Sequence, residues 1–558
     1  MSFKVSPTLT ILKVALAVAV SYAITWGLIL LFVDSSALKE PLAPILNFGL
    51  APWGFYYIPF FLCALLVTGE TLFNSYIPDD YGDAREATRE EIKEMDLLSD
   101  EGLILGQSDN FLSPYYIRTN EPLSSFLIAP PGTGKTAAII VPNLLSCTNS
   151  MFINDVKLEL WDLTSKQRGR MGKVGLFAPT LNLGKDKSLC FNPFAAECLP
   201  RSFADQIDFV DRMISILYPT GEEVSETSRY FNGNAKNLFL FWALRRIVID
   251  GETSLPRIYD DSTSTSDQQA AIAAIMENQS LPEFIRAKGN ALLDMDMKEF
   301  KSTSTSFTLM LEPFNRPNVR KYFEASDFTY KDFREKKPFS LYVGIPVRDM
   351  NRMAPVIKLM AQYLTLELMS DVKLFNRQNV TFMLDEFARL GFVPDLLNAP
   401  ELSRGCKMNF VFACQSMNQI RKLYNKNGAD AMQGLIDVCD YVIIYTQNDS
   451  DTALKLSKTI GNTTRKKGSK SRKWGDLTGS SSVSNEAWPF VTDQDLLNMG
   501  KNNMIVAVKG FKKRPIVCKK PWYYKSAAMN KLTGAYNDMK LCDDIEHDDT
   551  FTHCDEAA

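Results

Sequence analysis

Residues 129–145, APPGTGKTAAIIVPNLL, carry the chemical pattern that most restricts the function of this chain. They end as a phosphate-binding loop ends, with two glycines followed by Lys135 and Thr136. The written pattern of such loops, G-x-x-x-x-G-K-[ST], begins with a glycine, whereas this chain has Ala129 there. Alanine costs little at that position if its backbone keeps an ordinary negative φ, because the unusual angles belong to the later glycines. We therefore predict that the loop binds the phosphates of a nucleotide.

The flanking residues have the composition of a strand before the loop and a helix after it. The run 124–130, SSFLIAP, is short and apolar, and TAAIIVPNLL after the loop places apolar residues at helical spacing. Backbone amides at the start of that helix can point at phosphate oxygens. We expect Lys135 to reach the β and γ phosphates of ATP and Thr136 to ligate Mg²⁺. The predicted nucleotide-binding residues are Pro131, Gly132, Thr133, Gly134, Lys135, Thr136 and Ala137.

A pair of carboxylates supplies the second half of the predicted site. In 379–391, NVTFMLDEFARLG, the apolar strand VTFML leads directly into Asp385 and Glu386. In P-loop motors an aspartate at the end of a buried strand helps to hold Mg²⁺, and an adjacent glutamate can act as general base toward the attacking water. An acidic pair that only caps a helix is the alternative. The buried strand and the upstream phosphate loop favour ATP hydrolysis, with Asp385 as metal ligand and Glu386 as catalytic base.

Two further side chains are candidates for the same chemistry. Gln415 lies in KMNFVFACQSMNQI, residues 407–420, which we predict to contain a strand beside the one that leads into Asp385. At the tip of that strand Gln415 is placed to sense the γ-phosphate, or it is a surface glutamine that starts a helix. Arg404, in ELSRGCK, could stabilise the transferring phosphate across a subunit boundary as an arginine finger. Most exposed arginines have no such role, so a purely structural Arg404 remains the alternative.

The spacing of apolar runs predicts the fold that positions these residues. Runs at 151–157, 339–347, 440–449 and 502–510 repeat the strand pattern and are separated by helical stretches. Such alternation indicates an α/β fold with a mostly parallel sheet and its ligand at the carboxyl ends of the strands.

Two apolar segments precede this α/β region. Residues 9–33 and 47–69 are long enough to cross a bilayer, and Lys4, Lys13 and the basic residues after 84 place both ends in the cytoplasm. A secretory signal peptide is the alternative for the first segment, but it is shorter than this run and is not followed at once by a second span. The sequence therefore predicts a transmembrane helical hairpin in the lipid bilayer, attached to a cytoplasmic body.

Composition excludes several other classes of protein. The net charge of −3 gives no global positive field, so any nucleic-acid contact must be a local patch. The two histidines, His547 and His553, lie in the last dozen residues, which excludes histidine catalysis from the body of the chain. The 10 cysteines include no C-x-x-C pair and are typical of a reduced cytosolic protein.

Taken together, these motifs resemble those of type IV secretion coupling proteins of the TraG/TraD group. The likeness includes the two N-terminal spans and then, in the order of the family, AP-x-G-x-GKT, VPNLL, DVKLELWDLT, FNPF, LDEFARLG and the SRG…FACQS block. It extends to about Tyr524. The alanine at the start of the loop matches the family, whereas Leu158 stands where the family often has glycine in its D-x-K-G-E box.

The resemblance implies an ATPase of the bacterial inner membrane, multi-pass and hexameric when active, with a RecA-like P-loop NTPase domain and an inserted all-α domain. Its implied substrates are the relaxosome (relaxase and accessory proteins) with its DNA, effector proteins, or both. Its other implied partners are the ATPases and inner-membrane components of a type IV secretion channel. A nucleotide-switched substrate receptor without motor activity and a septum-type DNA translocase are the alternatives.

This interpretation divides the chain into five parts. We expect a transmembrane hairpin at 1–75, a nucleotide-binding domain in two parts at 76–196 and 328–530, an all-α inserted domain at 197–327, and an acidic disordered tail at 531–558. Amphipathic stretches such as FADQIDFVDRMISILY support the helical insertion. The basic segment 465–473 is either a mobile loop that contacts phosphates or a solvated connector between two strands. The acidic tail is either solvating only or a docking strip for a basic accessory protein.

Overall fold

The computed structural model describes nine stretches of the chain: residues 80–110, 113–181, 188–218, 225–375, 377–390, 393–415, 417–424, 431–471 and 480–536. Their contacts divide these residues into two units. Residues 80–85 and 460–495 form the smaller unit, and residues 86–459 and 496–536 form the larger one. The predicted transmembrane segments, and all of the acidic tail after residue 536, lie outside the described residues.

The larger unit is built on one sheet, which has 11 strands in the described part of the chain, in the order β2-β1-β13-β12-β9-β3-β8-β7-β4-β6-β5. The strands are β1 (Leu103–Gln107), β2 (Tyr116–Thr119), β3 (Ser125–Ile128), β4 (Ser150–Asn154), β5 (Lys173–Phe177), β6 (Phe339–Val343), β7 (Val380–Leu384), β8 (Met408–Cys414), β9 (Tyr441–Ile444), β12 (Asn503–Val508) and β13 (Ile516–Lys519).

Strand directions divide this sheet into a parallel part and an antiparallel edge. From β9 through β3, β8, β7, β4 and β6 to β5, every neighbouring pair is parallel. The strands β12, β13, β1 and β2 continue from β9 with antiparallel pairing. The predicted α/β fold with a mostly parallel sheet is therefore confirmed. The parallel strands are buried on both faces, which explains why they appear in the sequence as continuous apolar runs.

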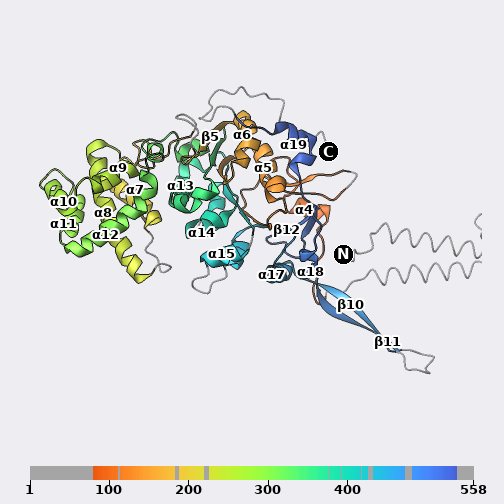
Figure 1. The fold of residues 1–558 in the computed structure, drawn as a ribbon. Helices are drawn as coiled ribbons and strands as arrows, with labels where there is room; N and C mark the ends of the chain where they lie inside the picture. The colour runs from red at the N-terminus through yellow and green to blue at the C-terminus, as the bar shows by residue number, and fades with distance from the viewer. Residues whose placement is uncertain are drawn as a thin grey trace, which may run out of the picture. The chain divides into compact units, whose positions relative to one another are not determined.

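Helices cover both faces of the sheet (Figure 1). The described α-helices are α4 (Arg89–Glu94), α5 (Val141–Ser146), α6 (Glu159–Met171), α7 (Phe203–Leu217), α8 (Glu226–Asp250), α9 (Leu255–Thr263), α10 (Gln268–Met276), α11 (Glu283–Leu293), α12 (Met297–Asn315), α13 (Met350–Ser370), α14 (Pro394–Ser403), α15 (Met417–Tyr424), α16 (Ala431–Val438), α17 (Ser450–Ile460), α18 (Asp493–Leu497) and α19 (Ala527–Leu532). The helices α5, α6 and α19 pack against one another, as do α13 and α14.

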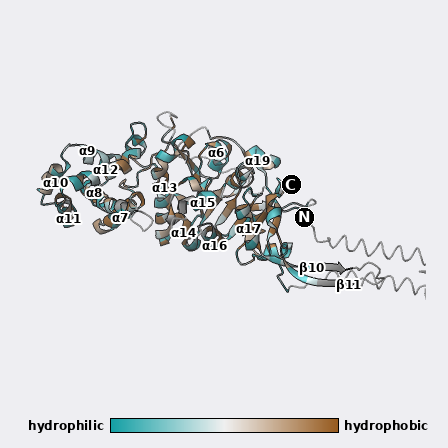
Figure 2. Ribbon diagram, turned by 60° about the horizontal axis from the view of Figure 1, so that its bottom comes forward, coloured by the Kyte–Doolittle hydropathy of each residue, from teal (hydrophilic) through white to brown (hydrophobic). Residues whose placement is uncertain are grey.

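Each face of the sheet has its own core. On one face, residues of α5, α6 and α19 such as Leu144, Trp161 and Met529 join strand residues in a single buried cluster. On the other face, Phe152, Phe382 and the rings of β8 stack across neighbouring strands, the first two with centroids 5.2 Å apart. Figure 2 shows hydrophobic residues concentrated along the strands of this unit. The sheet is thus held rigid between two apolar layers, and its strand ends are fixed points for a site.

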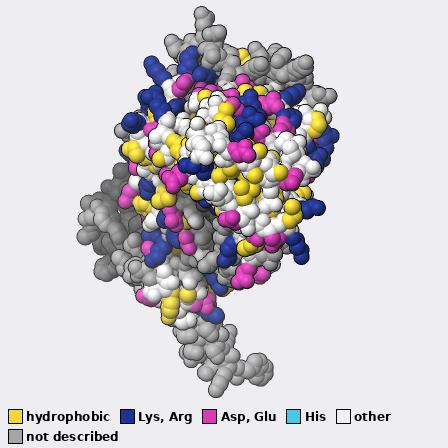
Figure 3. Space-filling view, turned by 90° about the vertical axis from the view of Figure 1, so that its left-hand side faces the viewer, with side chains coloured by type: hydrophobic (Ala, Val, Ile, Leu, Met, Phe, Trp, Pro, Cys, Tyr) yellow, Lys and Arg dark blue, Asp and Glu magenta, His cyan; other side chains and the backbone are white. Residues whose placement is uncertain are grey.

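The segment between β5 and β6 is helical where the structure describes it, from α7 to α12. The long helix α8 packs against α7, α11 and α12. Around it, the rings of Tyr218, Phe239 and Phe307 form a buried aromatic group, with Tyr218 stacked on Phe307 at 6.3 Å. Figure 3 looks onto the end where α10 and α11 lie, and basic and acidic side chains intermingle on that face.

In the smaller unit, residues 465–471 of the basic segment belong to a strand. Here β10 (Asn462–Ser471) pairs antiparallel with β11 (Ser480–Pro489), and Arg465 lies directly opposite Glu486. Lys467 Nζ lies 3.2 Å from Glu486 Oε2, and Arg465 lies over the ring of Trp488 at 4.8 Å. These cross-strand contacts explain why a basic, serine-rich sequence forms a hairpin where we expected a loop or a connector.

The predicted membrane location needs a correction. In the stretches that the structure describes, no helix combines the length and the apolarity that crossing a bilayer requires. The segments 9–33 and 47–69, on which the prediction of a multi-pass inner-membrane protein rested, lie outside those stretches. The structure thus does not support that prediction, which counted apolar residues in sequence alone, and we do not retain it.

Candidate active site

The phosphate loop connects β3 to a short helix, η3 (Thr136–Ile140), whose hydrogen bonds span one residue more than in an α-helix. Gly132 and Gly134 have φ of +74° and +90°, in the left-handed region that favours glycine. Ala129 is fully buried, and its N–H donates to the carbonyl of Cys414 at 3.0 Å. Ala129 thus extends the strand pairing of β3 with β8, which explains why glycine is not needed there.

Proline at position 142 accounts for the wide turn at the start of this helix. It is the second residue of α5, which follows η3 directly. Proline lacks the N–H that would donate a hydrogen bond to the preceding turn of an α-helix. Such single wide turns occur often at functional sites. Asn143, one residue later, bonds to both backbone groups of Ile104 in β1, with its Oδ1 2.7 Å from the Ile104 nitrogen. The helix that carries Lys135 and Thr136 is thereby fixed to the sheet.

The carboxylates that follow β7 lie against this loop. Lys135 Nζ is 2.8 Å from Asp385 Oδ1 and 4.0 Å from Glu386 Oε1. Thr136 Oγ1 donates to Asp385 Oδ2 at 3.5 Å. Residues about 250 positions apart in sequence thus converge at the carboxyl edge of the sheet, where the parallel strands β3 and β7 both end.

Glu386 is held in place by two neighbouring side chains. Its φ is +57°, a left-handed conformation that is rare for a residue with a side chain. Gln415 Nε2, at the end of β8, donates to Glu386 Oε1 at 2.6 Å, and Arg389 Nε pairs with Glu386 Oε2. Backbone strain of this kind clusters at functional sites. Gln415 therefore lies within the site, in direct contact with the predicted base.

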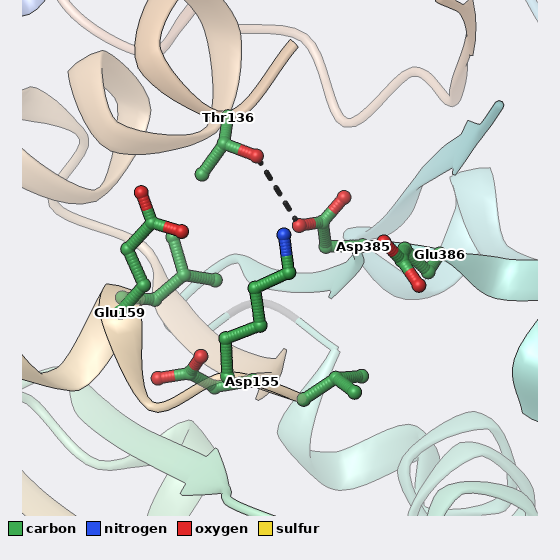
Figure 4. A pocket seen from close by; sticks show the side chains of 8 residues that line it. Thr136, Asp155, Glu159, Asp385 and Glu386 are labelled. Carbon is green, nitrogen blue, oxygen red and sulfur yellow. Dashed lines mark hydrogen bonds between the residues drawn. The ribbon is translucent and has the colours of Figure 1, made fainter. Parts of the chain in front are cut away.

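A third strand end brings another carboxylate. Asp155 follows β4, is almost fully buried, and accepts a hydrogen bond from the N–H of Trp161 at 2.7 Å. The pKa of Asp155 is raised to about 7, chiefly by burial; backbone hydrogen bonds oppose this rise, and the charge of nearby Asp385 contributes to it. Figure 4 shows Asp155 and Glu159 across a pocket from Asp385 and Glu386, with Thr136 bonded to Asp385. The pocket is lined by Thr136, Asp155, Val156, Lys157, Glu159, Leu160, Asp385 and Glu386.

The remaining predicted residues lie in different places. Pro131 and Gly132 are exposed, whereas Ala137 is half-buried next to Thr136. Arg404 begins the short helix η9 (Arg404–Cys406), which precedes β8. It therefore lies at the amino end of that strand, on the opposite edge of the sheet from Lys135. One chain alone does not bring Arg404 to the site.

Sequence reasoning missed Asp155 and Arg389 as site residues. Asp155 follows an apolar strand just as Asp385 does, so the same strand-end rule could have identified it. Arg389 lies in the short helix η8 (Phe387–Leu390), three residues after Glu386. Its pairing depends on the left-handed turn at Glu386, which no residue type in the sequence indicates.

The residues present fit a magnesium-bound triphosphate. A Cβ placed on Gly132 would meet no atom within 4 Å, so the loop is open there. Asn154 Oδ1, beside Asp385, is buried and has no hydrogen-bond partner within the described stretches. Among those same residues, no group of three or more His, Cys, Asp or Glu could hold a metal. Mg²⁺ needs no such cage, because it is usually bound through one or two carboxylates together with phosphates and water.

Comparison with known proteins agrees with this geometry. A family model for type IV secretory system conjugative DNA transfer matches residues 85–546. The protein VirD4 of Agrobacterium fabrum is 26% identical over 423 residues, which are 75% of this chain and 61% of that protein. A conjugal transfer protein TraG of Escherichia coli is 24% identical over 440 residues, covering 70% of this chain and 65% of TraG. The match thus spans about three-fifths of the length of these curated relatives.

Solved structures of the bacterial conjugative coupling protein TrwB share the fold. One, in complex with sulphate, aligns with a TM-score of 0.59 at 14% identity and covers 80% of this chain and 96% of that chain. Another, in complex with ADP and Mg²⁺, aligns with a TM-score of 0.57 over the same shares. From the family match over most of its length, this chain belongs to the type IV secretory system conjugative DNA transfer family.

Proposed function

We propose that this protein is a coupling ATPase, which uses ATP hydrolysis to deliver relaxase-bound DNA, protein substrates, or both into a type IV secretion channel. The observation that carries the proposal is the position of Lys135, whose Nζ lies 2.8 Å from Asp385 beside a phosphate loop. Support comes from TrwB, which shares the fold and binds ADP and Mg²⁺, and from the conjugal transfer proteins among the relatives.

Each residue of the site has a role in this proposal. Amides of the loop, from Gly132 to Thr136, bind the phosphates of ATP, and Lys135 neutralises the charge on the β and γ phosphates. Thr136 and Asp385 hold Mg²⁺. When bound, this ion neutralises charge that develops on the phosphate oxygens. Glu386 accepts a proton from the attacking water, and Gln415 and Arg389 keep its carboxylate oriented.

We propose that the subunits form a ring and that ATP hydrolysis in this ring moves the substrate. Arg404 lies at the sheet edge opposite Lys135. A neighbouring subunit can therefore present it to the site of the next subunit, where it serves as the arginine finger. In this arrangement a homohexamer has six sites, each completed by its neighbour.

A nucleotide-switched receptor that only recruits substrates is the competing function, and donor cells distinguish the two. With Glu386→Gln, which keeps the shape of the side chain but removes the base, we expect DNA transfer to fall to the level of a strain that lacks the protein. Glu401→Gln, an exposed position on α14, is the matched control and should transfer normally. Normal transfer by cells whose Glu386→Gln protein has no ATPase activity would exclude the motor.

A further inference from the structure

The segment that follows β13, residues 520–525 (KPWYYK), packs on the phosphate loop. Lys520 Nζ donates to the carbonyl oxygen of Thr133 at 2.9 Å. The indole of Trp522 lies directly on Gly134, since a Cβ built there would be 2.2 Å from its ring atoms. The last described strand of the sheet thus delivers an aromatic and basic segment to the loop.

Sheet topology places this segment on the side of the loop away from the catalytic carboxylates. β13 is antiparallel to β12, and β12 is antiparallel to β9, so β13 runs in the same direction as β9 and β3. Its carboxyl end therefore lies at the same edge as the loop. From β3, the strands β8 and β7 lead to Glu386, whereas β9, β12 and β13 lead the other way to Trp522.

Residues 520–525 are held by contacts of Lys520 and Trp522, whereas the ring of Tyr524 is exposed. Trp522 Nε1 donates to Asn502 Oδ1 at 3.1 Å, and Lys520 Nζ lies 3.8 Å from the ring centroid of Tyr445. Trp522 is 7% exposed, whereas Tyr524 is 48% exposed and its ring centroid is 5.4 Å from that of Trp522. The indole thus lies between the loop and an exposed tyrosine.

We propose that Tyr524, supported by Trp522, is the platform on which the base of the nucleotide stacks. This inference rests on the proposed function, in which the γ-phosphate lies toward Glu386. The nucleoside end of ATP then leaves the loop on the side of β9 and β13, where the residues 520–525 lie. A flat aromatic ring accepts the π-face of any base, so the platform contributes affinity for nucleosides with little choice between purines. Lys520 and Trp522 are positioning residues, because both act through the backbone of the loop.

Comparing ATP with inorganic tripolyphosphate separates the contribution of the nucleoside to binding from that of the phosphates. Binding of ATP and of inorganic tripolyphosphate, each with Mg²⁺, is measured by calorimetry on the full-length protein. Tyr524→Ala should weaken ATP about 5- to 150-fold and leave tripolyphosphate unchanged. Tyr524→Phe keeps the ring and should bind ATP as the wild type does. Tyr230→Ala, an exposed tyrosine of α8, is the control and should change neither affinity.

The possible failures are distinguishable. If Tyr524→Ala binds ATP as tightly as the wild type, or loses ATP and tripolyphosphate equally, the platform is excluded while the phosphate site remains. A wild-type protein that binds neither ligand would instead contradict the proposed function itself.

Discussion

Leu158 stands at a position where the family pattern often has glycine. It precedes α6 with φ +59° and ψ +11°, the left-handed conformation for which glycine is favoured. The glycine expected from the family box therefore has a local physical reason. In this chain the leucine side chain packs against the backbone of Gly344. A Cβ built on Gly344 would lie 2.5 Å from Leu158 Cδ2. Burial of that side chain offsets the backbone strain.

Because Leu158 has a left-handed backbone, we expect glycine to be more stable than alanine at this position, which is the reverse of the usual order in a helix. Leu158→Ala loses the packing and keeps the strain, whereas Leu158→Gly loses the packing and relieves the strain. We therefore expect Leu158→Gly to be more stable than Leu158→Ala by about 1 kcal/mol, measured from thermal midpoints. At the exposed Asp162 within α6, the usual order should hold, with alanine about 1 kcal/mol better than glycine. The same order at both positions would show that Leu158 is not strained.

The residues that could be predicted from sequence are those whose role follows from local order along the chain. Lys135 and Thr136 lie in a written motif, and Asp385 and Glu386 follow an apolar strand. Arg389 and Tyr524 could not be predicted in the same way. The roles proposed for them depend on one left-handed turn and on where β13 ends, which are properties of the folded backbone.

At the scale of elements, the helices α7 and α13 join the inserted helices to the sheet. The ring of Tyr363 in α13 lies 6.2 Å from Phe209 in α7, and Arg212 pairs with Glu367 at 3.4 Å. Burial raises the pKa of Glu367; Arg212 opposes that rise, and Asp371 adds to it. This carboxylate is therefore less stable in its charged form when the protein is folded than when it is unfolded.

A test at this junction follows from the sign of that shift. Because the pKa of Glu367 is raised on folding, the folded protein holds the proton above pH 4.5 while the unfolded chain releases it. The contribution of Glu367 to stability is present at low pH and is lost as pH rises through the folded pKa. Glutamine does not titrate, so the thermal midpoint of Glu367→Gln should rise relative to the wild type between pH 4.5 and 8. A constant difference across that range would contradict the shift.

The sheet shows which elements local sequence can predict. The predicted runs at 151–157, 339–347, 440–449 and 502–510 correspond to β4, β6, β9 and β12. The short strands β2 and β13, with four residues each, lie among antiparallel neighbours at one side of the sheet. Their few apolar residues form no distinct sequence pattern. They are strands because they pair with neighbouring strands, more than because of their own β-propensity.

At the scale of the whole molecule, the fold brings distant segments to one edge of the sheet. The loop after β3, the carboxylates after β7, Asp155 after β4 and the aromatic segment after β13 all lie at strand ends that point the same way. The order of strands sets the order of groups along the site, from Glu386, the proposed general base, to the phosphate loop and then to Tyr524, the proposed nucleoside platform. The proposed activity therefore requires the phosphate loop and the β7 carboxylates to act on one nucleotide.

Steady-state ATP hydrolysis by the purified protein, with and without single-stranded DNA, tests this claim most directly. We predict turnover by the wild type, none detectable for Lys135→Ala, and a decrease of about 10²- to 10⁴-fold for Glu386→Gln. Glu386→Gln should still bind ATP with Mg²⁺, because its loop is intact. Wild-type turnover by Glu386→Gln, or a wild-type protein that never hydrolyses ATP under either condition, would contradict the account.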